Sequence, residues 1–236
     1  MAEASFSRNS ENPMKRNSNN AFTLIELLVV IAIIAVLASI ALPVFTTVQE
    51  RGAQTKDLSN AKQIGLGLKL YAGDNDGKFP VVPANGTSND AFAQLIPQYV
   101  PTEKIFYLAK SAWTPAPPDE VFGVDANGAP ASDTLKAAEN NFAYVNNLSD
   151  TSNPNFPLIA DGFSTTAGTY TNDETAKGGV WKGKKAIVVR ADQSGAVEKC
   201  NSSYKVVGKT GAAQDGDIFA TSGTWLSATQ TAINPK

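Results

Sequence analysis

The sequence predicts an α+β protein in which one long N-terminal α-helix precedes an antiparallel β-sheet domain. Residues 22–45 form an apolar stretch, and residues 46–71 repeat apolar side chains at the three- and four-residue spacing of an amphipathic helix. Short β-prone runs separated by turn residues follow. At roughly 100–200 residues per domain, the 236 residues have room for one soluble domain beside the apolar stretch.

The apolar stretch is long enough to cross a membrane. Residues 27–45 carry no charge, and about twenty such residues span the hydrocarbon core of a bilayer. A secretory signal peptide has a shorter apolar region, of about 7–15 residues, and ends in a cleavage site, whereas this stretch continues into the amphipathic pattern. Arg8, Lys15 and Arg16 precede it, so the positive-inside rule places the N-terminus in the cytoplasm and the later residues across the membrane.

One acidic residue, Glu26, interrupts the apolar stretch. A carboxylate at bilayer depth costs roughly 2.5–3.5 kcal/mol on insertion scales, so we expect it to have a cationic partner. A single spanning helix offers none. The partner would be a positive group on another chain, or a free amino terminus made by cleavage just before Phe22. This requirement indicates assembly in a membrane rather than catalysis.

Composition excludes several classes of site. The chain has no histidine, which removes Ser-His-Asp and Cys-His nucleophilic schemes. Cys200 is the only cysteine, so neither an intrachain disulfide nor a zinc site of several thiolates is possible. The net charge of -2 gives no indication of a nucleic-acid-binding surface, and we expect no nucleic-acid partner.

At its N-terminus the chain resembles the type IV pilin and type II secretion pseudopilin superfamily. The matching residues are a basic pair, a ten-residue motif and a later proline: Lys15, Arg16, Ala21–Val30 and Pro43. In that superfamily a prepilin peptidase cuts before the phenylalanine and N-methylates the new terminus. The resemblance implies cleavage between Ala21 and Phe22 and N-methylation of Phe22, although the family usually has glycine in place of Ala21. Glu26 would then be the fifth mature residue, as the family requires.

The resemblance implies the pilin fold and a structural, non-enzymatic subunit. Its helix would polymerise into a type IV pilus-like filament or a type II secretion pseudopilus, with Glu26 neutralising the Phe22 terminus of a neighbouring subunit. Pro43 would kink the helix. The expected divisions are a leader (1–21), a transmembrane and filament-core helix (22–45), the amphipathic helix of the head (46–72), an α+β head (73–200), and an extension of strands or disorder (201–236).

The implied partners are other copies of the chain, other pilins or pseudopilins, the prepilin peptidase, and an inner-membrane assembly platform with its ATPase. The expected location is the bacterial inner membrane, with one pass, a cytoplasmic N-terminus and a periplasmic head, and later a periplasmic pseudopilus or an extracellular pilus. Three alternatives stay open: a minor pilin or adhesin, a DNA-uptake pilin, and a membrane-tethered binding module. Many adhesive pilins carry a C-terminal cysteine pair, and its absence favours the pseudopilin branch.

In the head we expect an antiparallel sheet on the distal half of the helix. The predicted strands are residues 141–145 and 157–160, followed by a hairpin of 183–190 and 195–199. Residues 91–99 could form a short helix. Asp57 is one of the charged residues between the apolar positions of the amphipathic helix, and Asp161 is interpreted as a turn and surface residue.

The end of the long helix has two interpretations. Gly73 and Gly77 tolerate left-handed turns, so helix-ending turn chemistry is the favoured one. Asp74 and Asp76 precede Gly77 with the alternation of a calcium loop, although no Glu stands at the later bidentate position. A calcium site at Asp74 and Asp76 is therefore the alternative, and no other cofactor is expected.

Overall fold

The structure, a computed structural model, describes residues 22–126, 128–210, 214–221 and 225–236. The predicted leader lies outside the described residues, and with it Ala21 on one side of the expected cleavage position. The chain divides into two compact units, Met1–Gln49 and Glu50–Lys236.

Helix α1 (Leu24–Asp74) includes both predicted helical segments. In the first unit all the described side chains are exposed. Pro43 lies inside the helix, and the hydroxyls of Thr46 and Thr47 donate hydrogen bonds to its carbonyl oxygen at 3.0 and 3.1 Å. The helix continues on both sides of this proline, and the kink expected there stays a prediction.

In the second unit, α1 buries one face in the head. The buried residues are spaced mainly by three and four positions: Gln54, Asp57, Asn60, Ala61, Ile64, Gly65, Gly67, Leu68 and Ala72. The helix ends later than predicted, because Gly73 is still helical and the left-handed residues are Asp76 and Gly77, with φ of 52° and 74°. Two consecutive left-handed residues cannot continue the helix, so the chain reverses here.

A five-stranded antiparallel sheet forms the main β layer of the head, as predicted. Its strands are β1 (Phe142–Val145), β2 (Pro157–Asp161), β3 (Lys185–Arg190), β4 (Gly195–Lys199) and β7 (Ala232–Ile233). Their order is β4-β3-β2-β1-β7. The predicted hairpin is confirmed, since β3 pairs with β4 from Lys185 opposite Lys199 to Val189 opposite Gly195. β7 comes from the segment expected to be an extension, as does the separate pair of β5 (Val207–Thr210) and β6 (Gln214–Asp217).

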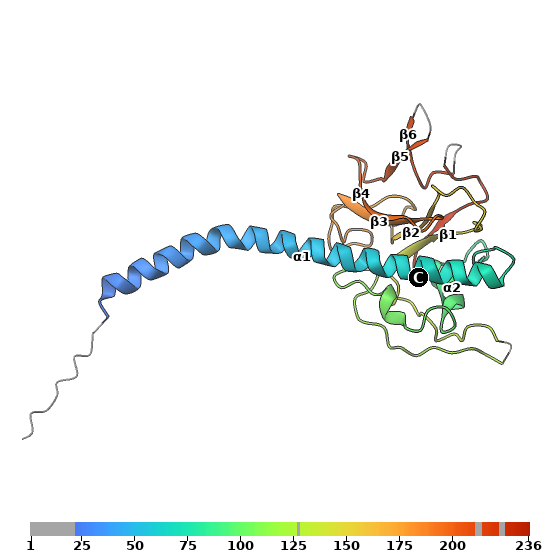
Figure 1. Cartoon of the computed structure of the whole chain (residues 1–236), viewed down its shortest axis with the longest axis horizontal. Helices are drawn as coiled ribbons and strands as arrows, with labels where there is room; N and C mark the ends of the chain where they lie inside the picture. The colour runs from blue at the N-terminus through green and yellow to red at the C-terminus, as the bar shows by residue number, and fades with distance from the viewer. Residues whose placement is uncertain (1–21, 127, 211–213, 222–224) are drawn as a thin grey trace, which may run out of the picture. The chain divides into compact units, whose positions relative to one another are not determined.

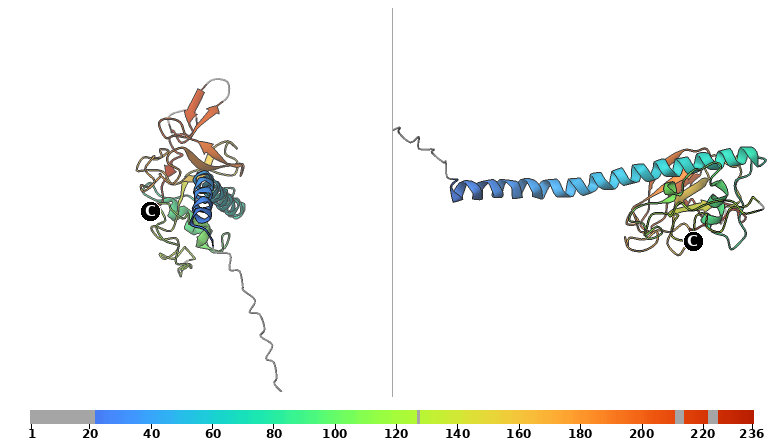
Figure 2. Two further views of the ribbon diagram at one scale, coloured as in Figure 1. Left: turned by 90° about the vertical axis from the view of Figure 1, so that its left-hand side faces the viewer. Right: turned by 90° about the horizontal axis from the view of Figure 1, so that it is seen from below.

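The helices that the described residues form between α1 and β1 are all short. They are α2 (Ser88–Phe92), η1 (Ala93–Leu95) and η2 (Glu103–Phe106), so the helix expected over 91–99 starts earlier and ends by Leu95. In Figure 1 the second half of α1 runs between the segment of these short helices and the sheet, and the right-hand view of Figure 2 shows it along one edge of the head. On each of these two sides, one glycine of α1 lets the neighbouring chain pack close to the helix. A Cβ on Gly65 would meet Gln193 beyond β3, and one on Gly67 would lie 2.8 Å from Val100 Cγ2.

Candidate assembly site and buried acid pair

The first turn of α1 is closed by a reciprocal pair of side chains. Thr23 donates from its backbone N and its hydroxyl to Glu26 Oε2 at 2.9 and 2.8 Å, and Glu26 N donates back to Thr23 Oγ1 at 3.3 Å. This arrangement is a capping box, which satisfies N–H groups that a helix start leaves free. Its signature, Thr-x-x-Glu ahead of an apolar run, is present in the sequence, although Glu26 was interpreted above from its charge and its place in the family motif.

The capping box uses only part of the acceptor capacity of Glu26. Both hydrogen bonds from Thr23 converge on Oε2, and the described residues place no donor on Oε1. An ionised carboxylate has about four acceptor positions. Glu26 can therefore hold the helix start of its own chain and accept a further donor from outside it.

An exposed apolar surface surrounds this carboxylate. The large apolar side chains from Phe22 to Val48 are between 45% and 80% exposed. Of the helices in the described part of the chain, α1 alone is long and apolar enough to cross a membrane. Apolar surface on this scale is covered by lipid or by other apolar surfaces in a stable protein.

Comparison with known proteins assigns this segment. A family model described as the prokaryotic N-terminal methylation motif matches residues 16–42. The chain carries the N-terminal methylation motif of type IV pilins and pseudopilins. No curated protein and no solved structure matches the chain.

For a pilin-like chain the motif implies processing by a prepilin peptidase and assembly with other pilins, and it indicates a structural rather than an enzymatic family. Phe22 lies just before α1 and is 74% exposed, so the residue expected at the mature terminus is accessible. Phe22 and Glu26 lie inside the matched segment, and Pro43 is the residue that follows it. Their roles in processing and assembly stay predictions.

A second polar arrangement lies in the head and was not predicted from the sequence. Asp161 is the last residue of β2 and is 1% exposed, so its interpretation as a surface turn residue is wrong. Its Oδ1 accepts from Asn141 Nδ2 at 3.1 Å, and its Oδ2 accepts from Trp181 Nε1 at 2.8 Å and from the backbone N of Ile187 at 2.7 Å. Burial is the larger effect and raises the pKa of Asp161, and these three donors oppose it by favouring the ionised form.

Asp57 of α1 is the partner of Asp161. It is also 1% exposed, and no N–H or O–H of the described residues donates to either of its oxygens. Two carboxylates cannot bond to each other unless one carries a proton. Burial, and then the charge of Asp161, raise the pKa of Asp57 well above its usual value. Because Asp161 already accepts three hydrogen bonds and Asp57 accepts none, the proton of the pair belongs on Asp57, from where it can bond to Asp161 and join α1 to β2.

The two aspartates proposed for calcium lie at the C-terminal end of α1. Asp74 Oδ2 accepts from the hydroxyl of Tyr99 at 2.8 Å, and Asp76 is the first left-handed residue of the turn. Asn75 N donates to Ala72 O and Gly77 N to the same oxygen, which is helix-ending turn chemistry. Calcium binding at Asp74 and Asp76 stays a prediction.

Proposed function

We propose that this chain is a non-catalytic filament subunit, cut between Ala21 and Phe22, N-methylated at Phe22, and polymerised through α1. The observation that carries the proposal is Glu26, a carboxylate inside an apolar helix surface that also bears the methylation motif. Cleavage before Phe22 creates a cation four residues from Glu26, and its methylated form keeps the charge.

The pairing between subunits follows from electrostatics in an apolar environment. The amino terminus of Phe22 on one subunit and Glu26 Oε1 on its neighbour would each be penalised if buried alone. Together they attract strongly at low dielectric, so the pair sets the axial register of packed helices more than it adds net stability. The apolar side chains of α1 would exchange lipid contacts for contacts with like helices, which are equally apolar.

Within the superfamily, we propose the pseudopilin branch. The chain has a single cysteine, Cys200, and so cannot close the C-terminal disulfide loop that many adhesive pilins have. On this proposal the subunit sits in the bacterial inner membrane with its head in the periplasm, and an assembly platform with its ATPase draws it into a periplasmic filament.

The test uses the native host carrying Glu26→Ala, with Ser39→Ala as the matched control. Ser39 lies in the same apolar segment, and among the described residues its hydroxyl bonds only to Val36 O of its own helix. We expect mass spectrometry to find N-methyl-Phe22 as the first residue in all three strains. Cross-linking should give filament ladders for wild type and Ser39→Ala, and only monomer for Glu26→Ala.

Two results would refute the proposal. One is a chain that keeps its original methionine and stays monomeric in the membrane. The other is Glu26→Ala subunits that assemble as well as wild type, which would favour a membrane-tethered binding module.

A further inference from the structure

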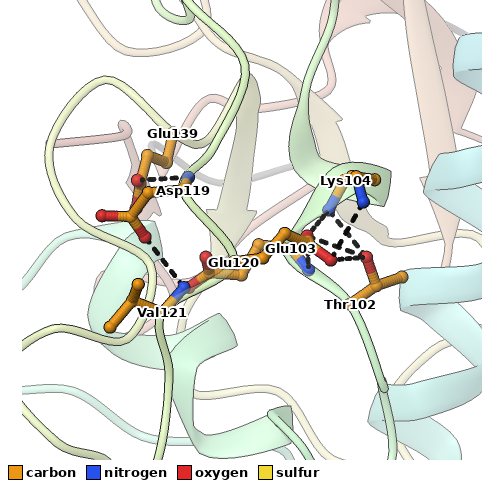
Figure 3. Close-up of polar contacts among 7 residues, drawn as sticks. All are labelled: Thr102, Glu103, Lys104, Asp119, Glu120, Val121 and Glu139. Atoms are coloured by element: carbon orange, nitrogen blue, oxygen red, sulfur yellow. Dashed lines mark hydrogen bonds and ion pairs between the residues drawn. The ribbon is translucent and has the colours of Figure 1, made fainter.

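Three carboxylates lie together in the part of the head that runs from η2 to β1. Glu103 is the first residue of η2, and Asp119 and Glu139 belong to the irregular chain that follows. One carboxylate oxygen of each lies within 4.8 Å of the other two. Figure 3 shows Asp119 beside Glu139, joined by the hydrogen bond from Asp119 N to Glu139 Oε1 at 3.2 Å.

Glu103 supplies a second and independent observation. Its side chain is fully buried, and Oε1 accepts a hydrogen bond from the backbone N of Leu135 at 2.6 Å. Its other oxygen, Oε2, is buried and receives no donor from the described residues. A buried carboxylate oxygen is normally bonded to a donor or to a cation. Glu103 therefore points to a ligand that the neighbouring side chains do not provide.

The surrounding charges are out of balance. Glu120 is a fourth acid of the group, and its Oε1 accepts from the backbone N of Glu103 and of Lys104 at 3.0 Å each. Two cations face these acids, with Lys136 Nζ 2.7 Å from Asp119 Oδ2 and Lys104 Nζ 3.4 Å from Glu120 Oε2. With all four acids ionised, these six side chains hold two more negative than positive charges.

We propose that Glu103, Asp119 and Glu139 bind a divalent cation of the size of calcium. All the ligand atoms are carboxylate oxygens, which hard cations prefer. Calcium–oxygen distances of about 2.3–2.6 Å place oxygens on opposite sides of the ion about 5 Å apart, so the three oxygens fit around one ion. One such ion also removes the excess of negative charge.

The ion would tie together a part of the head that has little other regular structure. In the described part of residues 107–141 there is no helix or strand, and Glu103, Asp119 and Glu139 are separated by long stretches of this chain. A cross-link removes more conformational entropy from the unfolded chain when the loops that it closes are long. Calcium should therefore stabilise the folded head, and this inference does not depend on whether the subunit polymerises.

The test uses the full-length chain in detergent, stripped with EDTA and titrated with CaCl2. Isothermal titration calorimetry gives the stoichiometry, and tryptophan fluorescence gives the midpoint of thermal unfolding. We expect one calcium ion per chain and a midpoint that rises with calcium concentration. Glu139→Gln and Glu103→Gln should each weaken binding at least tenfold.

Two isosteric controls should bind calcium like wild type. Asp76→Asn removes a carboxylate from the turn that resembles a calcium loop. Glu174→Gln removes an exposed carboxylate that pairs with Lys182 at 2.9 Å. If Glu103→Gln fails to fold, Asp119→Asn replaces it, because the Asp119 side chain is 43% exposed.

Several outcomes would overturn the proposal. One is a wild-type chain that gives no heat and no change of midpoint with calcium, which would mean that Glu103 is held neutral by a proton. Another is binding that survives in Glu139→Gln and Asp119→Asn. A third is binding lost in Asp76→Asn alone, which would place the ion at the end of α1. An equal response to magnesium would refute the assignment of ion size.

Discussion

Replacing Asp57 with asparagine should remove a pH dependence that is built into the contact between α1 and β2. In the folded chain Asp57 carries a proton, because burial and the Asp161 carboxylate raise its pKa well above the usual value. In the unfolded chain the same group is exposed and has an ordinary pKa near 4. The folded chain therefore binds more protons than the unfolded chain once the pH exceeds about 4, and stability must fall as pH rises from there.

The size of the effect follows from proton linkage. Each pH unit over which the folded chain keeps this proton, and the unfolded chain has lost it, lowers the free energy of unfolding by about 1.4 kcal/mol. The decline ends where Asp57 ionises in the folded chain. In Asp57→Asn the amide N–H replaces the carboxyl O–H as donor to Asp161. The pH dependence that Asp57 gives to the free energy of unfolding therefore vanishes, and the stability of the variant rises relative to wild type as pH increases.

Denaturant unfolding of the detergent-solubilised chain from pH 5 to pH 8 measures this slope. Trp113, Trp181 and Trp225 are buried in the head, and Trp181 donates directly to Asp161, so tryptophan fluorescence reports this region. Asp57→Ala removes the donor and should be less stable than Asp57→Asn at every pH, by about 1–3 kcal/mol. An Asp57→Asn protein with the wild-type slope would show that the two acids do not share a proton.

The remaining predictions concern the helix start and two glycines. Thr23→Ala should cost about 1 kcal/mol of capping energy, measured as faster amide exchange in the first turn of α1 in micelles; unchanged exchange would mean that the capping box is idle. Gly162→Ala should lower the thermal midpoint, because its Cβ would lie 2.5 Å from Trp113 Nε1. Gly77→Ala should cost about 1–2 kcal/mol, since φ is 74° and its Cβ would meet Asp150; a stable variant would contradict the strained turn.

Features with a local period were predictable from the sequence. The apolar stretch, the amphipathic repeat and the hairpin of β3 and β4 each depend on residues close together in the chain, so hydrophobic spacing and turn residues were enough. The capping box of Thr23 and Glu26 is equally local and was predictable from its spacing. Glu26 also carries a charge at bilayer depth, which by itself predicts a partner outside the chain.

The buried acids could not be predicted in this way. Asp57 occupies a polar position in the pattern of an amphipathic helix, and Asp161 precedes a glycine, which is typical of a surface turn. Only the packing of α1 on the sheet brings them together and excludes water. Glu103, Asp119 and Glu139 lie in a segment without periodicity, where sequence alone gives no register and therefore no neighbours.

The packing of α1 along the head has a mechanical consequence. From Glu50 to Asp74 the helix has the sheet on one side and the segment of α2 and η1 on the other, with Gly65 and Gly67 in close approach to each. A tension applied along the helix axis would load the whole of this interface in shear, so its contacts would have to break together rather than one after another. The rest of the head should therefore resist separation from α1 under tension far better than its modest amount of regular secondary structure suggests.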